Sequence, residues 1–375
     1  MLTPETRRAD FPSIEGKAYL NTAAEGIPPL PAREALNHYF EHKSLGMECR
    51  DHLFAEYDTC RQRAANVLGF EEEEIAFCSS SSEAYNLLAT AIAPESADEI
   101  VITDLEFPAG ATPWLSLPGN PTVHLWKNRD GMLELDDLAA LLSERTRLVQ
   151  VSLVSFLTGY RIPWAPLRDL VRERAPQAIL SVDVTQAAGR IVLDCQDADC
   201  LIGSTYKWLL GTHGGAVVAV PRTSSEKVTA RAGGWYHLVN AFDADRFTRV
   251  EPKPGADSFA VGMPSFPAIY ALSASLDYLD SIGIEAIAAH ADPIVARLHE
   301  GLAELGIKTM SPFQPDASSG IVSFQHQRDE EIHAALLAEN IHVMHQAGRL
   351  RISIHGYNQA DDIDRLLGSL RSTLR

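Results

Sequence analysis

The chain has 375 residues, of which 46% are hydrophobic and 22% are charged, and its formal net charge is −18 at pH 7. This composition is typical of a globular protein, and at this length we expect two domains because single hydrophobic cores stop growing at roughly 250–300 residues. So acidic a chain has no basic stripe to replace the counterions of nucleic acid, and we do not expect nucleic acid as a partner. No apolar run approaches the ~20 residues that span a bilayer, and we do not expect a membrane as a partner. A small-molecule substrate is what we expect.

The N-terminal segment carries Arg7 and Arg8 but no apolar run of the kind found in a secretory signal. We therefore expect the chain to stay in the cytoplasm. The five cysteines include no Cys-x-x-Cys pair, which agrees with a reducing compartment. Cys78, Cys195 and Cys200 lie in or beside strand-like runs, where we expect small buried hydrophobic residues and no metal site.

Between about residues 65 and 220, short β-type runs alternate with helical patterns. The strand-like runs are 75–78, 99–103, 122–126, 147–154, 178–182, 200–203 and 215–220, and the helical patterns are 83–93, 135–142 and 165–174. This alternation predicts an α/β fold with a mostly parallel sheet. In such sheets ligands bind beyond the carboxyl ends of the strands.

A polar stretch with proline and glycine at 251–257 interrupts this alternation. Beyond it, helical patterns at 293–305, 330–340 and 359–370 flank strand-like runs at 320–324 and 350–353. We predict a large domain over 20–255 and a smaller α+β domain built from 1–19 and 256–375, with an interdomain helix near 266–282.

Three polar residues follow the predicted strands at 178–182 and 200–203. A lone lysine is usually a solvated charge, but Lys207 lies in an apolar setting, and burial lowers a lysine pKa and makes the amine the nucleophile that a Schiff base requires. Asp183 is either an ordinary turn residue or a carboxylate that faces a pyridinium nitrogen and keeps the ring electron-withdrawing. Gln186, three residues further on, would reach the ring hydroxyl.

A serine run at 79–82 precedes a helical pattern, and Ser80 with Glu83 fits a capping box. The serines either cap the helix only or, with the free backbone N–H groups of its first turn, bind a phosphate. Ser204 and Tyr206 could close the other side of that site. Each signal is weak alone, but together, in this order and at strand ends, they predict a site for pyridoxal 5'-phosphate.

At these residues the sequence resembles the class V aminotransferase family, the fold type I pyridoxal-phosphate enzymes that include cysteine desulfurases, kynureninases and isopenicillin N epimerase-like proteins. The resemblance covers nearly the whole chain and implies the three-layer large domain of that fold type. It is carried by seven ordered blocks, at residues 19–24, 80–86, 106–108, 183–186, 204–207, 262–267 and 349–358.

The resemblance implies a role for each matching residue. It implies that Lys207 carries the Schiff base with the cofactor, that Asp183 pairs with the pyridine nitrogen and that Gln186 contacts the ring oxygen. Arg351 matches the arginine that binds the substrate α-carboxylate, a task suited to its bidentate fork, although a structural salt bridge is an equal reading of the residue alone. The positions that match cofactor-binding residues of the family are Ser81, Ser82, Ser204 and Tyr206 for the phosphate, and Phe107, a core residue on its own pattern, for the aromatic ring stacked on the cofactor.

Three departures from the family pattern narrow the expected chemistry. Cysteine desulfurases have a longer loop with the catalytic cysteine before the arginine, whereas 341–349 is short and has none, so we do not expect a persulfide-forming desulfurase. Phe156 stands where many relatives place an asparagine near the ring oxygen. Met263 stands where relatives often have a threonine that reaches the phosphate of the neighbouring subunit, a contact that a backbone N–H can also make.

We therefore predict an enzyme that acts on the α-amino group of an amino acid, with aminotransferase-type chemistry. A C–S or other β-lyase and an epimerase remain alternatives because they use the same core residues, and a noncatalytic pyridoxal-phosphate-binding protein is the rival from another class. A nicotinamide-binding protein is disfavoured because no GxGxxG motif follows the first strand. The candidate residues on the substrate side, besides Arg351, are Asn21, His345, His355, Tyr160 and Arg161.

The resemblance also implies a homodimer, since relatives build each site across a two-fold interface. The expected contributors from the second subunit are residues 262–265 and 233–236. The alternative is that these residues pack within one chain.

Overall fold

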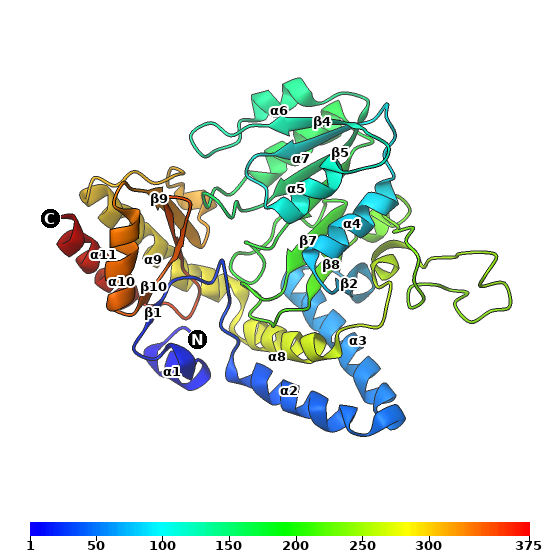
Figure 1. Cartoon of the computed structure of the whole chain (residues 1–375), viewed down its shortest axis with the longest axis horizontal. Helices are drawn as coiled ribbons and strands as arrows, with labels where there is room; N and C mark the ends of the chain where they lie inside the picture. The colour runs from blue at the N-terminus through cyan, green and yellow to red at the C-terminus, as the bar shows by residue number, and fades with distance from the viewer.

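A computed structural model describes residues 1–375, except for the side chain of Asp316. The chain has one sheet of seven strands, one of three and one of two, and the helices after residue 284 gather to one side of the largest sheet (Figure 1). The predicted fold class, a mostly parallel α/β sheet with a smaller α+β part, is confirmed.

The large sheet has seven strands in the order β2-β8-β7-β6-β5-β3-β4. Strand β8 runs antiparallel to its neighbours β2 and β7, and the remaining pairs are parallel. Most of these strands are buried along their whole length, as is typical of a sheet covered on both faces. The strands are β2 (Ile75–Cys78), β3 (Glu99–Thr103), β4 (Thr122–Trp126), β5 (Thr146–Ser152), β6 (Ile179–Asp183), β7 (Cys200–Ser204) and β8 (Ala216–Ala219).

Helices cover both faces of this sheet. Successive side chains of a strand point to opposite faces, and in β3 Ile100 and Ile102 pack with α4 and α5, whereas Val101 belongs to the apolar cluster that includes α3, α6 and α7. The result is a three-layer arrangement. The helices are α3 (Arg50–Leu68), α4 (Ser81–Ile92), α5 (Pro108–Leu115), α6 (Leu135–Leu141) and α7 (Trp164–Arg174).

The first 70 residues contain helices that the pattern analysis did not locate. Helix α2 (Leu30–Lys43) fully buries only Ala32, so its sequence has little apolar periodicity to detect. Helix α8 (Phe266–Ile282), at the predicted position, packs against α2 and α3. A further helix, α1 (Pro4–Asp10), opens the chain.

The small sheet has the order β11-β12-β9, with both pairs antiparallel. It packs with the last helices of the chain around a separate apolar core. The N-terminal segment joins this part, because β1 (Ala18–Tyr19) pairs with β10 (Ile341–His342). The elements are α9 (Ile284–Glu304), β9 (Ile321–Gln325), α10 (Asp329–Ala338), β11 (Met344–Gln346), β12 (Arg349–Ser353) and α11 (Ala360–Leu374).

Helix α9 begins nine residues before the predicted start at residue 293, and Pro293 lies inside it. The prediction placed Pro293 at the first turn, where its missing N–H costs nothing. Ile284, Ile287 and Ala291 are buried on the same helix and extend its apolar face toward the N-terminus, so packing outweighs the lost hydrogen bond.

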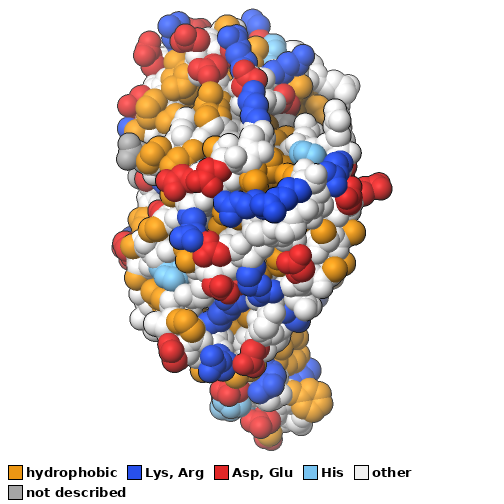
Figure 2. All heavy atoms as spheres, turned by 90° about the vertical axis from the view of Figure 1, so that its left-hand side faces the viewer, with side chains coloured by type: hydrophobic (Ala, Val, Ile, Leu, Met, Phe, Trp, Pro, Cys, Tyr) orange, Lys and Arg blue, Asp and Glu red, His pale blue; other side chains and the backbone are white. Residues whose placement is uncertain are grey.

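Acidic and basic side chains are interspersed with apolar ones on the face that includes the C-terminal helices (Figure 2). The negative net charge is therefore not gathered into one patch on that face. None of the helices among the described residues is both long and apolar enough to cross a lipid bilayer.

Short 3-10 turns lie at Pro12–Ile14, Gly46–Cys49, Glu72–Glu74, Arg222–Ser224, Gly255–Phe259 and Pro315–Ala317.

Candidate active site

A cavity of about 210 Å³ opens at the carboxyl ends of the parallel strands. It contains eight of the residues predicted to hold the cofactor, which lie at the ends of four strands, β2, β3, β6 and β7, or in the segments that follow them. These are Ser81, Ser82, Phe107, Asp183, Gln186, Ser204, Tyr206 and Lys207. The fold thus brings together side chains that are up to 126 positions apart, from Ser81 to Lys207.

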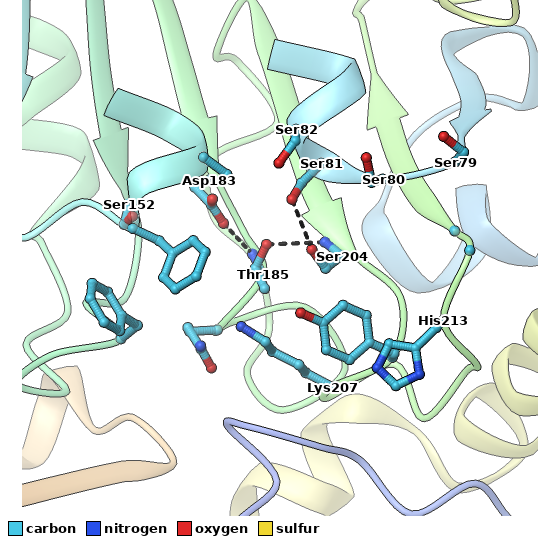
Figure 3. A pocket seen from close by; sticks show the side chains of 17 residues that line it. Ser79, Ser80, Ser81, Ser82, Ser152, Asp183, Thr185, Ser204, Lys207 and His213 are labelled. Atoms are coloured by element: carbon cyan, nitrogen blue, oxygen red, sulfur yellow. Dashed lines mark hydrogen bonds between the residues drawn. The ribbon is translucent and has the colours of Figure 1, made fainter. Parts of the chain in front are cut away.

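Lys207 lies in the loop after β7 and is 7% exposed. Its Nζ points into the cavity (Figure 3), 5.3 Å from the centre of the Phe107 ring and 5.6 Å from that of Tyr206. Burial lowers the pKa of this amine to about 8, and the negative charge of Asp183 opposes the shift. At pH 7 about one amine in ten is then neutral and nucleophilic.

The loop that carries Lys207 is held by a very close approach of the N-terminal segment. The N–H of Gly26 donates to the carbonyl of Tyr206 over 2.9 Å, and a Cβ at position 26 would lie 1.9 Å from the carbonyl oxygen of Lys207. Glycine is therefore required at this position for steric reasons.

Asp183 is the last residue of β6 and is 6% exposed. The N–H of Thr185 donates to its Oδ1 over 2.7 Å, and the Tyr85 hydroxyl donates to its Oδ2 over 2.9 Å. The Thr185 hydroxyl in turn accepts from the N–H of Ser204 over 3.0 Å, which joins the ends of β6 and β7 (Figure 3). These contacts fix the direction in which the carboxylate points.

Hydroxyl groups gather at the start of α4. Ser80 is the N-cap residue, and its Oγ accepts from the N–H of Glu83 over 3.2 Å. The Ser204 hydroxyl donates to Ser81 Oγ over 3.0 Å, so serines of two elements meet there (Figure 3). The predicted capping box is only half correct, because the Glu83 carboxylate accepts from the N–H and hydroxyl of Ser79 instead of the N–H of Ser80.

Gln186 lines the cavity, but both ends of its amide are already bonded. Its Nε2 donates to the carbonyl of Ala23 over 3.1 Å, and its Oε1 accepts from Trp208 Nε1 over 2.7 Å. The amide therefore ties the Lys207 loop to the N-terminal segment, and a contact to a ring hydroxyl would have to replace or share one of these bonds.

Two phenylalanines form one wall of the cavity. The rings of Phe107 and Phe156 meet edge to face, with centres 5.1 Å apart. Phe107 is 44% exposed, so its assignment as a core residue on its own pattern was wrong. Its open face is available to a planar ligand, as the family resemblance implies.

The predicted substrate-side residues do not line the cavity itself. Arg351 is buried on β12, where its Nη1 donates to the carbonyl of Phe156 over 3.0 Å, so one residue separates it from the cavity. Asn21 forms an isolated bridge with Ser353, next to the same strand. Met263 is 43% exposed in a neighbouring groove that shares Ser79, Gly214 and Gly215 with the cavity.

The four other substrate-side candidates do not line the cavity and make contacts elsewhere, so their role toward the substrate stays a prediction. The Tyr160 hydroxyl donates to the carbonyl of Leu133 over 3.4 Å, and Arg161 pairs with Asp194 at 3.4 Å. His345 hydrogen-bonds to Asp329 over 2.5 Å. His355 is fully buried, with Nε2 2.9 Å from the carbonyl of Trp208, and burial lowers its pKa to about 3.

Sequence reasoning missed other residues of the site. Ser152, Thr185 and His213 line the cavity, and the His213 ring stacks on Tyr206 with centres 4.5 Å apart. Behind the wall, Glu106 is buried, and Ser152 Oγ donates to its Oε2 over 3.0 Å. The sequence did not indicate Ser152 as a site residue because the predicted strand, 147–154, includes it as an interior position, whereas β5 ends at Ser152.

Comparisons with known proteins agree with this geometry. The family model described as aminotransferase class-V matches residues 18–366. The uncharacterized aminotransferase YcbU of Bacillus subtilis (strain 168) is 25% identical and aligns over 96% of this chain and 95% of its own length. A probable cysteine desulfurase of Pseudomonas putida is 28% identical over 99% of this chain and 98% of its own.

Solved structures share the fold. The apo structure of a cysteine desulfurase from Thermococcus onnurineus NA1 has a TM-score of 0.87 at 24% identity and covers 99% of this chain and 98% of its own. A C-DES mutant with glycine covalently linked to its pyridoxal-phosphate cofactor has a TM-score of 0.85 at 22% identity, with 97% and 98% covered.

Proposed function

We propose, from the premise that this chain belongs to the class V aminotransferase family of pyridoxal-phosphate-dependent enzymes, that it transfers the α-amino group of an amino acid with Lys207 as its central catalytic residue. The observation that carries the proposal is the buried Lys207 amine in the same cavity as the Asp183 carboxylate and the serine-rich start of α4.

The residues of the cavity fit pyridoxal 5'-phosphate. The Lys207 amine can react with the aldehyde of the cofactor, because its pKa of about 8 leaves part of it uncharged. The carboxylate of Asp183, held in one direction by its two hydrogen bonds, can pair with the pyridine nitrogen. The hydroxyls of Ser81 and Ser204 and the free N–H groups of the first turn of α4 can donate hydrogen bonds to the phosphate, and the helix dipole favours negative charge there.

When bound, the cofactor supplies an electron-withdrawing ring that takes up electrons from the substrate Cα. The protein supplies the proton transfers and the binding groups. The Lys207 amine removes the proton from Cα and returns it, a task that contributes typically ~10²–10⁴-fold. Asp183 would keep a proton on the ring nitrogen, Phe107 would pack on the ring face, and Arg351 would bind the substrate α-carboxylate.

A persulfide-forming desulfurase reaction is not proposed. Within 341–349, Ala347 and Gly348, with φ of 52° and 73°, form the tight turn of the hairpin that joins β11 to β12. None of the described residues that line the cavity is a cysteine. All five cysteines are buried, and burial raises the pKa of Cys78, Cys195 and Cys200, so their thiols are poor nucleophiles.

The test is a screen of amino acids against the purified, cofactor-loaded protein, each with and without a keto acid as amino acceptor, with keto acid, new amino acid, ammonia and sulfide measured as products. Keto acid formed only together with a second amino acid supports amino transfer. Ammonia or sulfide without an amino acceptor indicates the alternative, a β-lyase. A protein that fails to bind the cofactor, or that turns over no amino acid, refutes the proposal.

We also propose the homodimer that the family resemblance implies. Large apolar side chains are exposed near the expected contacts, with Trp235 38%, Met263 43%, Phe242 81% and Phe247 86% exposed. Such side chains favour a protein partner. Full activity of a monomer that is independent of concentration would refute this proposal.

The division into 20–255 as the large domain, with 1–19 and 256–375 as the small one, likewise stays a proposal. It is supported by the pairing of β1 with β10 and tested by limited proteolysis near residue 255. The cytoplasmic location stays a prediction that cell fractionation tests.

A further inference from the structure

Two arginines of β12 lie on the same face of the small sheet. Leu350 and Ile352 pack into the apolar core with α9 and α11, and side chains alternate along a strand. Arg349 and Arg351 therefore face the other way, toward residues 156–157, which follow β5. Their Cα atoms are two residues apart on an extended strand, so they are separated by roughly 7 Å.

Both guanidinium groups are buried without a compensating carboxylate. Each arginine is 4% exposed, and each donates from Nη1 to a backbone carbonyl, Arg349 to Leu157 over 2.9 Å and Arg351 to Phe156 over 3.0 Å. Among the described residues, Nε of either arginine has no hydrogen-bond partner. Burial lowers the pKa of both, and the charge of Arg349 further lowers that of Arg351, to about 10.

Other polar atoms on this face also lack partners among the described residues. Ser323 pairs in register with Arg351, and Ser353 follows two positions after it, so both point the same way. Both serines are fully buried, and neither hydroxyl is hydrogen-bonded. Buried polar groups are normally paired, so two hydroxyls and two guanidinium groups with free donors on one face indicate a ligand that is anionic.

This face adjoins the cavity through a single residue. Phe156 lines the cavity, its carbonyl accepts from Arg351, and its ring centre is 5.7 Å from Cζ of Arg349. The charge of Arg351 also acts on Lys207, whose pKa it lowers after the larger effect of burial. Phe156 is thus the residue that separates a ligand at Lys207 from the two arginines.

Resting on the proposed function, we propose that Arg349 binds a second carboxylate of the substrate, so that the enzyme acts on amino acids whose side chain ends in a carboxylate and on the corresponding keto acids. Arg351 binds the α-carboxylate and Arg349 binds the distal one. A buried guanidinium fork suits a carboxylate because it donates two parallel hydrogen bonds. Two negative charges also neutralise two buried positive charges, whereas a monocarboxylic substrate leaves one of them unpaired.

The test compares succinate with propionate, which share a carboxylate and differ in the second one, by calorimetric titration of the cofactor-loaded enzyme. We expect succinate to bind at least tenfold more tightly than propionate. In Arg349→Met, which keeps a long side chain without charge, succinate should lose roughly 30- to 1,000-fold in affinity while propionate changes less than threefold. Arg351→Met should weaken both ligands.

Thermal melting shows whether Arg349→Met folds. If it does not, Arg349→Lys and Arg349→Gln take its place in the test. The lysine variant should recover part of the succinate affinity because it keeps the charge, and the glutamine variant should not. Equal binding of the two ligands by the unaltered enzyme, or an unchanged ratio in all folded Arg349 variants, would overturn the inference and leave Arg349 as a residue that only braces the 156–157 backbone.

This binding test separates the inference from the function on which it rests. Kinetics with aspartate, glutamate and alanine supply the second arm, in which kcat/KM for the two acidic substrates should fall in Arg349→Met and that for alanine should not. Absence of turnover with every amino acid would refute the proposed function, whereas turnover by an unaltered enzyme that does not prefer succinate to propionate would refute the role of Arg349 alone.

Discussion

Replacement of Glu106 by glutamine should change the pH dependence of stability in a definite direction. Glu106 is buried behind the cavity wall, and burial, followed by the charge of Asp183, raises the pKa of its carboxyl from 4.5 to about 8. Below pH 4.5 the group is protonated in the folded and unfolded chains alike. Between pH 4.5 and 8 the unfolded chain releases the proton while the folded chain keeps it, so this group makes the protein less stable as pH rises.

The size of the effect follows from the two pKa values. Each unit of difference corresponds to about 1.4 kcal/mol, so the full loss is about 5 kcal/mol, and between pH 5 and pH 8.5 it is about 4 kcal/mol. Glutamine has the shape of the protonated acid and can still accept from Ser152, but it releases no proton. The free energy of unfolding of Glu106→Gln, relative to that of the unaltered protein, should therefore rise by about 4 kcal/mol over this range.

Urea unfolding of the cofactor-free protein at pH 5 and pH 8.5 measures this difference. Glu300→Gln is the matched control, because Glu300 is exposed on α9 and its replacement should give the same small difference at both pH values. If the difference between Glu106→Gln and the unaltered protein is the same at both pH values, the carboxyl is ionised in the folded state and the reasoning about its burial is wrong.

Three further predictions concern the cavity. Lys207→Ala should lower turnover by at least ~10²–10⁴-fold and should prevent borohydride from fixing the cofactor to the chain, which mass spectrometry measures. In the unaltered protein, the rate of cofactor capture, followed by absorbance, should rise with pH and level off above the lysine pKa of about 8, because only the neutral amine reacts. A capture rate independent of pH would contradict this. Asp183→Asn should keep the cofactor but lower kcat by roughly 10- to 100-fold, since a hydrogen bond to a charged group contributes about 1.5–3 kcal/mol, and unchanged steady-state rates would show that the carboxylate does not act on the ring. Gly26→Ala should destabilise the protein by about 1–3 kcal/mol because its Cβ would lie 1.9 Å from the Lys207 carbonyl oxygen, and a melting temperature equal to that of the unaltered protein would show that the two segments separate easily.

The sequence by itself determined that the large sheet is mostly parallel and that the candidate residues lie at the carboxyl ends of its strands. Strands β2 and β3 have the predicted bounds because runs of apolar residues buried on both faces leave a clear signal. The edge strand β4 also has its predicted bounds, although most of it is not buried. Asp183 and Lys207 were located by the same logic, since polar residues after successive parallel strands must meet at one edge. Local patterns suffice here because the geometry of a parallel sheet is the same in every protein.

Only the tertiary structure decided what lies beside those residues. Arg349 and Arg351 are two positions apart, but their burial without a carboxylate depends on the packing of β12 against residues 156–157 from another part of the chain. In the same way, the raised pKa of Glu106 depends first on its burial and then on the charge of Asp183, which is 77 positions away. Burial and charge at a site are sums over neighbours in space, and no pattern along the chain specifies which distant segments those neighbours come from.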